Sequence, residues 1–340
     1  MEPWPDHFHI ASDYRTEIIV DWDNPILAFK ANRERYTQPS KNEGLPHLGN
    51  PYSDDAITWN IFRSLQKAGS LDIITDKIGI GKPRGLLIWS LAPELGGDSI
   101  IPKSPESGSV NSRLQYITGN LLRKSEGVLP GQIDEPDVVI LGATGVAVGV
   151  VCKQPELNEA RNPWKSKVNQ VRHLIMNIKK YEKRHRDAQE KTIIHGENSS
   201  SLRHSNTNDA NEKPNSNNGK HDILKDGTRE KEVVPVYQLL KMALLAKELG
   251  NYFNVEPVVV AIANTRTWSS TVLEGGKSAS GLWKTFTGML GENSPRCEII
   301  FWQHLNRLMS SKSLPGLRSY LVKRPSLYDV GPLPWDSWEA

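Results

Sequence analysis

A carboxylate and an ammonium stand at the two ends of one apolar segment, which reads PDVVILGATGVAVGVVCK from Pro136 to Lys153. Asp137 follows the proline at the start of the segment, and Lys153 closes it. A carboxylate can hold a metal ion, and an ammonium can stabilise negative charge that develops during a reaction. Whether the two groups can act together depends on how the chain between them folds.

The central letters of this segment, GATG, permit a dinucleotide-binding interpretation. That fingerprint requires a strand, a tight glycine turn and then a helix whose N-terminus meets the pyrophosphate. The letters VVIL supply the strand, but Gly145 is followed by VAVGVV, and β-branched residues and glycine are poor helix formers. An NAD(P)-binding Rossmann-type protein is therefore the least favoured of the functions considered.

The same letters favour a β-hairpin, in which DVVIL forms one strand, GATG turns and GVAVGVVCK returns. Gly142 and Gly145 are expected to supply the positive φ angles of a tight connection. The alternation of a strand puts Val151 and Lys153 on one face of the returning strand. Asp137, at the foot of the first strand, is then expected near Lys153 at the open end of the hairpin.

Helices and strands alternate around this hairpin. A helix is expected over residues 53–68, where Asp54 and Asp55 lie near its positively polarised start. A second strong helical pattern covers residues 235–250. Further elements are expected as strands at 85–91, 256–265 and 297–302 and as a helix at 162–183. Strands mixed with helices in this order indicate an α/β fold.

The pair Pro136-Asp137, the short hairpin and Lys153 together resemble the PD-(D/E)XK nuclease superfamily. The resemblance implies a restriction-endonuclease-like core, with a mixed central sheet flanked by helices. It also implies that Asp137 is a Mg²⁺ ligand, that Lys153 positions or activates the attacking water, and that the preceding helix offers Asp54 or Asp55 as a further metal ligand. The implied function is metal-dependent phosphodiester hydrolysis of DNA.

One position departs from the pattern of this superfamily. The residue two places before the lysine is a glutamate in the family and is Val151 in this chain. Mg²⁺ takes oxygen ligands, and valine offers none, so Mg²⁺ or Mn²⁺ is expected to bind weakly or not at all. Three functions stay open: an impaired endonuclease, an active metal-dependent nuclease whose second metal ligand has migrated to another position, and a catalytically inactive pseudo-nuclease that binds nucleic acid or a protein partner.

A basic stretch follows the hairpin. Residues 161–191 hold ten Lys or Arg against three Asp or Glu, and an apolar stripe in the same stretch predicts that one face packs. Such a helix can neutralise phosphates and so bind nucleic acid without reading its sequence, although an ordinary solvated helix face carries the same pattern. The candidate nucleic-acid contacts are Lys165, Lys167, Arg172, Lys179, Lys180 and, early in the later helix, Gln238.

The composition limits the remaining classes. The net charge of +3 in 340 residues does not by itself indicate a nucleic-acid partner. The two cysteines form neither a metal-binding spacing nor a disulfide framework, which suits a reducing, cytoplasmic location. Neither a signal peptide nor a membrane span is expected.

Local composition predicts five regions. Almost no large apolar residues occur in the segment ENSSSLRHSNTNDANEKPNSNNGKHD, which therefore cannot offset its chain entropy by burial. The expected regions are a loosely ordered N-terminus at 1–50 with one strand at 16–22, the first part of a nuclease-like domain at 51–186, a disordered low-complexity insertion at 187–231, the second part of the domain at 232–312, and a C-terminal tail at 313–340.

Overall fold

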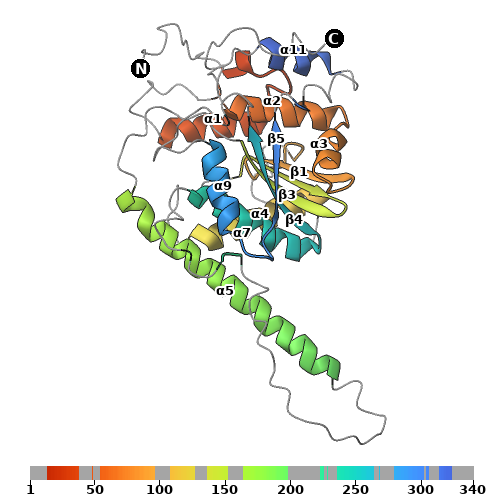
Figure 1. Ribbon diagram of the computed structural model, residues 1–340. Coiled ribbons are helices and arrows are strands. Elements are labelled where there is room, and N and C mark those ends of the chain that lie inside the picture. The colour runs from red at the N-terminus through yellow and green to blue at the C-terminus, as the bar shows by residue number, and fades with distance from the viewer. Residues whose placement is uncertain are drawn as a thin grey trace, which may run out of the picture.

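The computed structural model shows a central sheet with helices on both of its faces (Figure 1). The structure describes residues 14–37, 48, 54–95, 108–126, 136–151, 164–197, 223–225, 228, 236–263, 268, 279–301, 304–305 and 314–323.

The sheet has five strands in the spatial order β1-β2-β3-β4-β5. Strand β2 runs antiparallel to both of its neighbours, whereas β3, β4 and β5 are mutually parallel. The chain therefore has the expected mixed α/β architecture. The carboxyl ends of β1, β3, β4 and β5 meet the amino end of β2 at one edge of the sheet, which we call the carboxyl edge. The strands are β1 Pro83–Ile88, β2 Val138–Gly142, β3 Gly145–Val151, β4 Glu256–Ala263 and β5 Arg296–Phe301.

The hairpin interpretation of the GATG segment is confirmed, because β2 pairs antiparallel with β3 and Val138 lies opposite Gly149. The dinucleotide interpretation is wrong, because a strand and not a helix follows Gly145. The expected positive φ angles are also wrong for Gly142 and Gly145. A Cβ on Gly142 would lie 2.2 Å from the carbonyl oxygen of Ile80, so close approach of the backbone explains this glycine.

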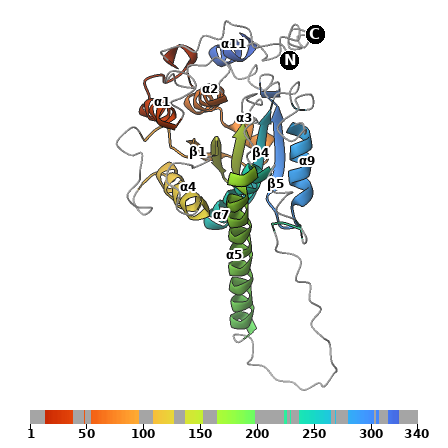
Figure 2. The same ribbon diagram turned by 90° about the vertical axis from the view of Figure 1, so that its left-hand side faces the viewer.

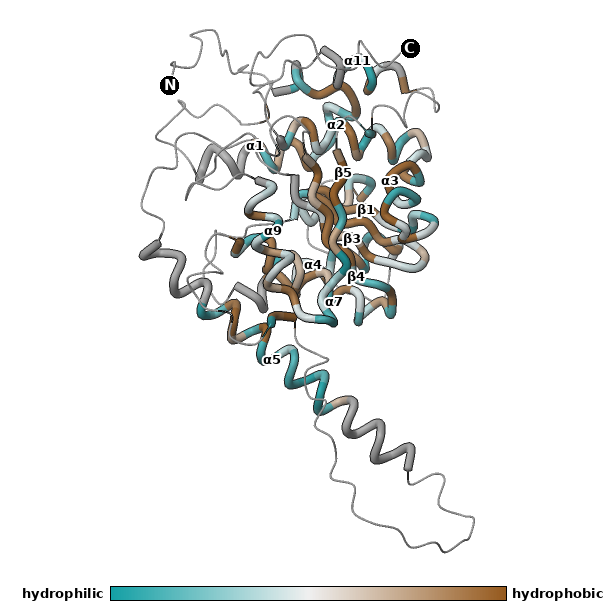
Figure 3. Tube along the Cα trace, in the orientation of Figure 1, coloured by the Kyte–Doolittle hydropathy of each residue, from teal (hydrophilic) through white to brown (hydrophobic). Residues whose placement is uncertain are grey.

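Helices cover the two faces of the sheet with separate hydrophobic cores. One face carries α1 (Pro25–Thr37), α2 (Asp54–Lys67), α3 (Asp72–Lys77) and α11 (Pro315–Lys323). The other face carries α4 (Val110–Glu126), α7 (Tyr237–Phe253) and α9 (Ala279–Met289). Hydrophobic residues concentrate on the strands between these layers (Figure 3). None of the helices that the structure describes has the length and apolarity that crossing a membrane would require.

The outer edge of β1 is covered by α4. The side-chain oxygen of Asn111, near the start of α4, accepts a hydrogen bond from the backbone N–H of Leu86 at 2.8 Å. Gln115, one turn later, accepts one from the N–H of Ala92, also at 2.8 Å. Both amide side chains are buried. The backbone of this edge is therefore hydrogen-bonded to α4 side chains.

The N-terminal region differs from the prediction of a loosely ordered segment with a strand at 16–22. A short 3-10 helix spans Tyr14–Glu17, and α1 follows. The side-chain amide of Asn60, in α2, accepts a hydrogen bond from Ile19 N–H at 2.9 Å and donates one to the carbonyl of Glu17 at 2.8 Å. A helix side chain, and not a neighbouring strand, therefore satisfies these two backbone groups.

In three places the structure has ordered residues where the sequence predicts a disordered insertion or a tail. Helix α5 (Trp164–Glu197) continues beyond residue 187, where disorder was predicted to start. Near the other end of the predicted insertion, Ile223 is fully buried and its N–H bonds the Glu182 side chain at 2.9 Å. Within the predicted C-terminal tail, α11 packs through buried Leu317. Isolated apolar residues thus gain partners from distant elements, which local composition does not show. Residues 198–222 lie outside the described part of the chain.

A charged network fastens this N-terminal region to α2. Arg63 Nη2 lies 2.6 Å from Asp21 Oδ2, and Lys67 Nζ lies 3.0 Å from Asp21 Oδ1. Asn24 also donates a hydrogen bond to the Asp21 carboxylate at 3.0 Å. Burial alone would raise the pKa of Asp21, but hydrogen bonds from Lys67, Asn24 and Arg63 outweigh it and lower the pKa. The folded protein therefore stabilises ionised Asp21.

We expect Asp21→Asn to cost about 1.5–3 kcal/mol of unfolding free energy at pH 7, because hydrogen bonds to two cations are weakened. Since the folded pKa is below the unfolded value, the contribution of Asp21 is full above about pH 4 and is lost as the pH falls further. Urea unfolding of both proteins at pH 7 and pH 3 measures this effect. A difference between wild type and variant that stays constant from pH 7 to pH 3 would contradict it.

Candidate active-site edge

The predicted acid Asp137 lies at the carboxyl edge, immediately before β2. Its carbonyl oxygen accepts a hydrogen bond from the N–H of Trp89, the residue that follows β1, at 3.1 Å. The side chain of Asp137 is half-buried. The other predicted catalytic residue, Lys153, lies outside the described part of the chain, as does the side chain of Val151 at the end of β3.

Trp89 and Ser90 form a strained turn next to Asp137. Both have positive φ angles, 51° and 64°, which non-glycine residues adopt rarely and at a cost of about 1–2 kcal/mol each. Ile88 and Leu91 close the turn with hydrogen bonds in both directions, at 2.8 Å and 2.9 Å. Backbone strain of this kind is found at functional sites more often than elsewhere, which makes the turn a candidate element of a site.

The indole of Trp89 joins three elements at this edge. It is buried, and it stacks on Trp59 of α2 with ring centroids 5.7 Å apart and planes 16° apart. The ammonium of Lys30, in α1, lies 5.0 Å from the centroid of the Trp89 ring. Through its backbone Trp89 also holds Asp137. The end of β1 is therefore tied to α1, α2 and the start of β2.

The predicted helix acids lie near the same place. Asp55, in the first turn of α2, forms an ion pair with Lys30, with Oδ1 3.5 Å from Nζ. Lys30 also lies over the ring of Trp89, whose backbone N–H bonds Asp137. Asp55 therefore lies at the carboxyl edge that also holds Asp137. Asp54 begins α2, and its side chain lies outside the described residues. Sequence reasoning missed Lys30, although Asn24-Pro25, a cap residue followed by proline, is a helix-start signal.

The strand register separates the two strand positions of the predicted metal site. Val138 lies opposite Gly149, so one step outward brings Asp137 level with Val150. Residues opposite each other share a face, and successive residues alternate. Asp137 precedes β2, and continuing this alternation one residue beyond Val138 assigns it to the face covered by α4 and α7, whereas position 151 falls in register on the face covered by α2. The helix acid Asp55 shares the face of Val151.

These residues do not fit a Mg²⁺ site. The ion requires several oxygen ligands in near-octahedral geometry. Asp55 is paired with an ammonium, and the register directs Asp137 to the opposite face. Within the described ranges, three His, Cys, Asp or Glu side chains do not come together anywhere. We therefore derive no metal-dependent step from this arrangement.

Among the described residues, three buried polar atoms at or near this edge have no hydrogen-bond partner: Trp89 Nε1, Ser90 Oγ and Thr58 Oγ1. Thr58 lies one turn after Asp55 in α2. A buried donor or acceptor without a partner costs about 1–3 kcal/mol. The strained turn and these buried polar atoms each cost folding free energy, so this edge is less stable than fully hydrogen-bonded, unstrained residues would make it.

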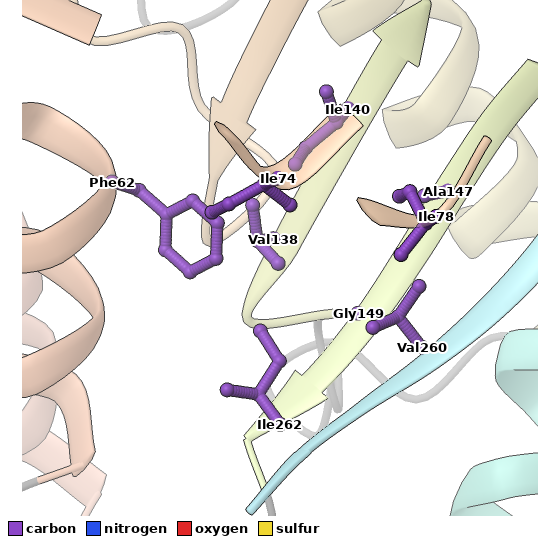
Figure 4. A pocket seen from close by; sticks show the side chains of 9 residues that line it. All are labelled: Phe62, Ile74, Ile78, Val138, Ile140, Ala147, Gly149, Val260 and Ile262. Carbon is purple, nitrogen blue, oxygen red and sulfur yellow. The ribbon is translucent and has the colours of Figure 1, made fainter. Parts of the chain in front are cut away.

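Below the edge, the space between α2, α3 and the sheet is a small apolar cavity of ≈ 10 Å³ (Figure 4). Its lining side chains come from Phe62, Ile74, Ile78, Val138, Ile140, Ala147, Val260 and Ile262, together with Gly149. A volume of this size holds about one water, and this lining offers no polar partner. The cavity therefore belongs to the packed core.

Cys297 does not add a nucleophile. Burial, and then the charge of Glu298, raises the pKa of Cys297 to about 12, so its thiol stays protonated at neutral pH. Cys152 lies outside the described residues.

The basic helix α5 is well anchored. Asn251 of α7 donates a hydrogen bond to the hydroxyl of Tyr181, and Arg184 lies 3.2 Å from Glu248. Burial raises the pKa of Tyr181 above its ordinary value, so this hydroxyl remains neutral. α5 packs against α4 and α7 and leaves the body on the side away from α2 (Figures 1 and 2).

One face of α5, which we call the basic face, presents cations to solvent. Its residues are spaced by four and three positions, which places them on one side of a helix, and all of them are exposed: Arg172, Met176, Lys179, Lys183 and Arg186. Lys180 is exposed beside this face. The side chains of the candidate contacts Lys165 and Lys167 lie outside the described residues. Gln238, half-buried, lies in the first turn of α7, at the end opposite Asn251 and the contacts that anchor α5.

Comparison of the chain with protein-family models, with curated proteins and with solved structures found no match in any of the three.

Proposed function

We propose that this chain is a nuclease-like protein that binds nucleic acid. The proposed ligand is DNA, and the proposed metal-dependent cleavage is impaired. A restriction-endonuclease-like core is supported by the order of elements. Helix α2 precedes the hairpin β2–β3, Asp137 stands at its foot, and α7 and β4 follow. This is the order that the sequence resemblance implies.

The observation that carries nucleic-acid binding is the basic face of α5. Its four cations extend over about 21 Å, at 1.5 Å per residue from position 172 to 186. Among the described side chains of α5, the acids are Glu182, which is buried, and Asp187, which is exposed. A row of exposed cations of this length matches the repeated charge of a phosphate backbone.

The impaired cleavage rests on the carboxyl edge. Valine stands at position 151, Asp55 is paired with Lys30, and Asp137 belongs to the other face of the sheet. Wild-type protein with 10 mM Mg²⁺ or Mn²⁺ is therefore expected to leave plasmid and single-stranded DNA intact. Cleavage that disappears in Asp137→Asn would replace this proposal with that of an active nuclease.

Binding by the basic face predicts a strong dependence on salt. Four phosphate contacts correspond to a slope of about −3.6 in log K against log salt, or a loss of roughly 150-fold in affinity from 50 to 200 mM. In the double variant Lys179→Ala/Lys183→Ala, the loss of affinity over the same salt range should be only about 12-fold. Fluorescence anisotropy with a labelled duplex, measured at several salt concentrations, gives these slopes.

Alanine at both Lys77 and Lys82 provides the matched control. These lysines are exposed on α3 and just before β1, in a part of the molecule remote from α5. The control should keep the wild-type slope. A slope near zero in the wild type, or equal slopes for the two double variants, would refute binding by α5 and leave the protein-binding pseudo-nuclease.

A further inference from the structure

We propose that the ammonium of Lys30 stands in place of a divalent cation at the carboxyl edge, so that this site excludes metal by means of a residue of its own chain. The inference does not depend on nucleic-acid binding. It rests on where α1 places Lys30 and on what surrounds it.

Lys30 is held in position by its surroundings. Ile26, Leu27 and Ala31 are buried and fix α1 against α2 and the sheet. The Lys30 side chain then lies between the Asp55 carboxylate, 3.5 Å from its Nζ, and the face of the Trp89 indole. Lys30 and Asp55 have side chains only 23% and 17% exposed. Both contacts are strengthened by this partial exclusion of water.

Trp89 is in turn fixed by its neighbours. Its ring stacks on Trp59, and its backbone adopts the rare positive φ of 51°. The strained turn therefore has a consequence for the site, because it presents the indole face under the Lys30 ammonium. An aromatic face attracts a cation, and it cannot serve as an oxygen ligand for a metal ion.

Distances show that the ammonium and a metal ion compete for Asp55. A Mg²⁺ ion bound to Asp55 Oδ1 would lie about 2.1 Å from that oxygen. With Lys30 Nζ 3.5 Å from the same atom, the two cations would be at most about 5.6 Å apart. Repulsion between a divalent ion and an ammonium at this separation opposes metal binding unless Lys30 leaves its place.

The charge balance agrees with this exchange. One ammonium neutralises one carboxylate, whereas a divalent ion is held best by two or more. Valine at position 151 offers no carboxylate where the superfamily that the sequence resembles has a glutamate. Among the described side chains, Lys30 and Asp55 form an ion pair at this edge that balances one charge of each sign.

Titration of the full-length protein with Mn²⁺, followed by the electron paramagnetic resonance signal of the free ion, tests the proposal. Wild-type protein should bind no Mn²⁺ below about 1 mM. Lys30→Met removes the charge but keeps an unbranched apolar chain over Trp89, and it should bind Mn²⁺ at least tenfold more tightly. Adding Asp55→Asn to Lys30→Met should abolish that gain.

Lys67→Met is the matched control, because Lys67 also pairs with an acid of its own, Asp21 at 3.0 Å, but away from the carboxyl edge. It should not increase Mn²⁺ affinity. If Lys30→Met is unfolded by circular dichroism, Lys30→Gln replaces it with the same expectation. The proposal is overturned if wild-type protein binds micromolar Mn²⁺ through Asp55, or if a folded Lys30 variant shows no gain.

Discussion

Gly142→Ala should lose about 3 kcal/mol or more of unfolding free energy. The added Cβ would lie 2.2 Å from the carbonyl oxygen of Ile80 and 2.9 Å from its carbonyl carbon. Because these are backbone atoms, the loop before β1 or the hairpin must move. Movement would also break the 3.0 Å hydrogen bond from Thr144 N–H to Ile80 O. Overpacking costs about 1–3 kcal/mol, and the lost hydrogen bond adds about 1.

The same substitution at Gly119 is the control. Gly119 lies within α4, and a Cβ there would meet no atom within 4 Å. Alanine inside a helix is favoured over glycine by about 0.5–1 kcal/mol, so Gly119→Ala should stabilise the protein. Urea unfolding of the two variants should therefore give shifts of opposite sign. Equal small shifts would show that the contact between the hairpin turn and Ile80 is loose.

Trp89→Ala should cost about 3–5 kcal/mol, the range for removing a large buried aromatic side chain. The indole fills the space between Trp59 and Lys30, so its loss leaves a cavity and removes the support of α1. The effect should extend beyond stability, because Lys30 would no longer be held beside Asp55. Urea unfolding measures the first effect, and proteolysis between α1 and α2 measures the second.

Trp89→Phe separates packing from hydrogen bonding. Phenylalanine keeps a ring between Trp59 and Lys30 and removes the buried Nε1–H, for which the described residues offer no hydrogen-bond partner. The cost should be below about 1.5 kcal/mol, as for other swaps that keep most of the volume. If Trp89→Phe proves as destabilising as Trp89→Ala, the indole N–H donates a stabilising hydrogen bond, and packing alone does not explain the effect.

The hairpin could be predicted because its evidence is local. Val146, Val148 and Gly149 disfavour a helix whatever surrounds them. The same holds for β1 and for α2, whose apolar spacing is read within one element. The reason for the glycines could not be predicted. It depends on Ile80, which is about sixty residues away in sequence and is brought to Gly142 by the fold.

The candidate site was predictable only in part. Asp137 and Asp55 were found from their places at the start of a strand and of a helix, and the structure puts both at the carboxyl edge. Lys30 was missed, because its role depends on two contacts, with Asp55 and Trp89, that join three separate elements. The pairing register of β2 and β3 could not be predicted from the sequence either. A shift of one residue would move every side chain of a strand to the other face of the sheet.

Asn111 has a consequence for how this protein can meet other molecules. An outermost strand with unused N–H groups can accept an additional strand from a peptide or from a second copy of the chain, which is also a common start of aggregation. At β1 the N–H of Leu86 already donates a hydrogen bond to the Asn111 side chain, and α4 packs against the outer edge of this strand. Growth of the sheet from this side would require α4 to detach, so recognition by strand addition is disfavoured there.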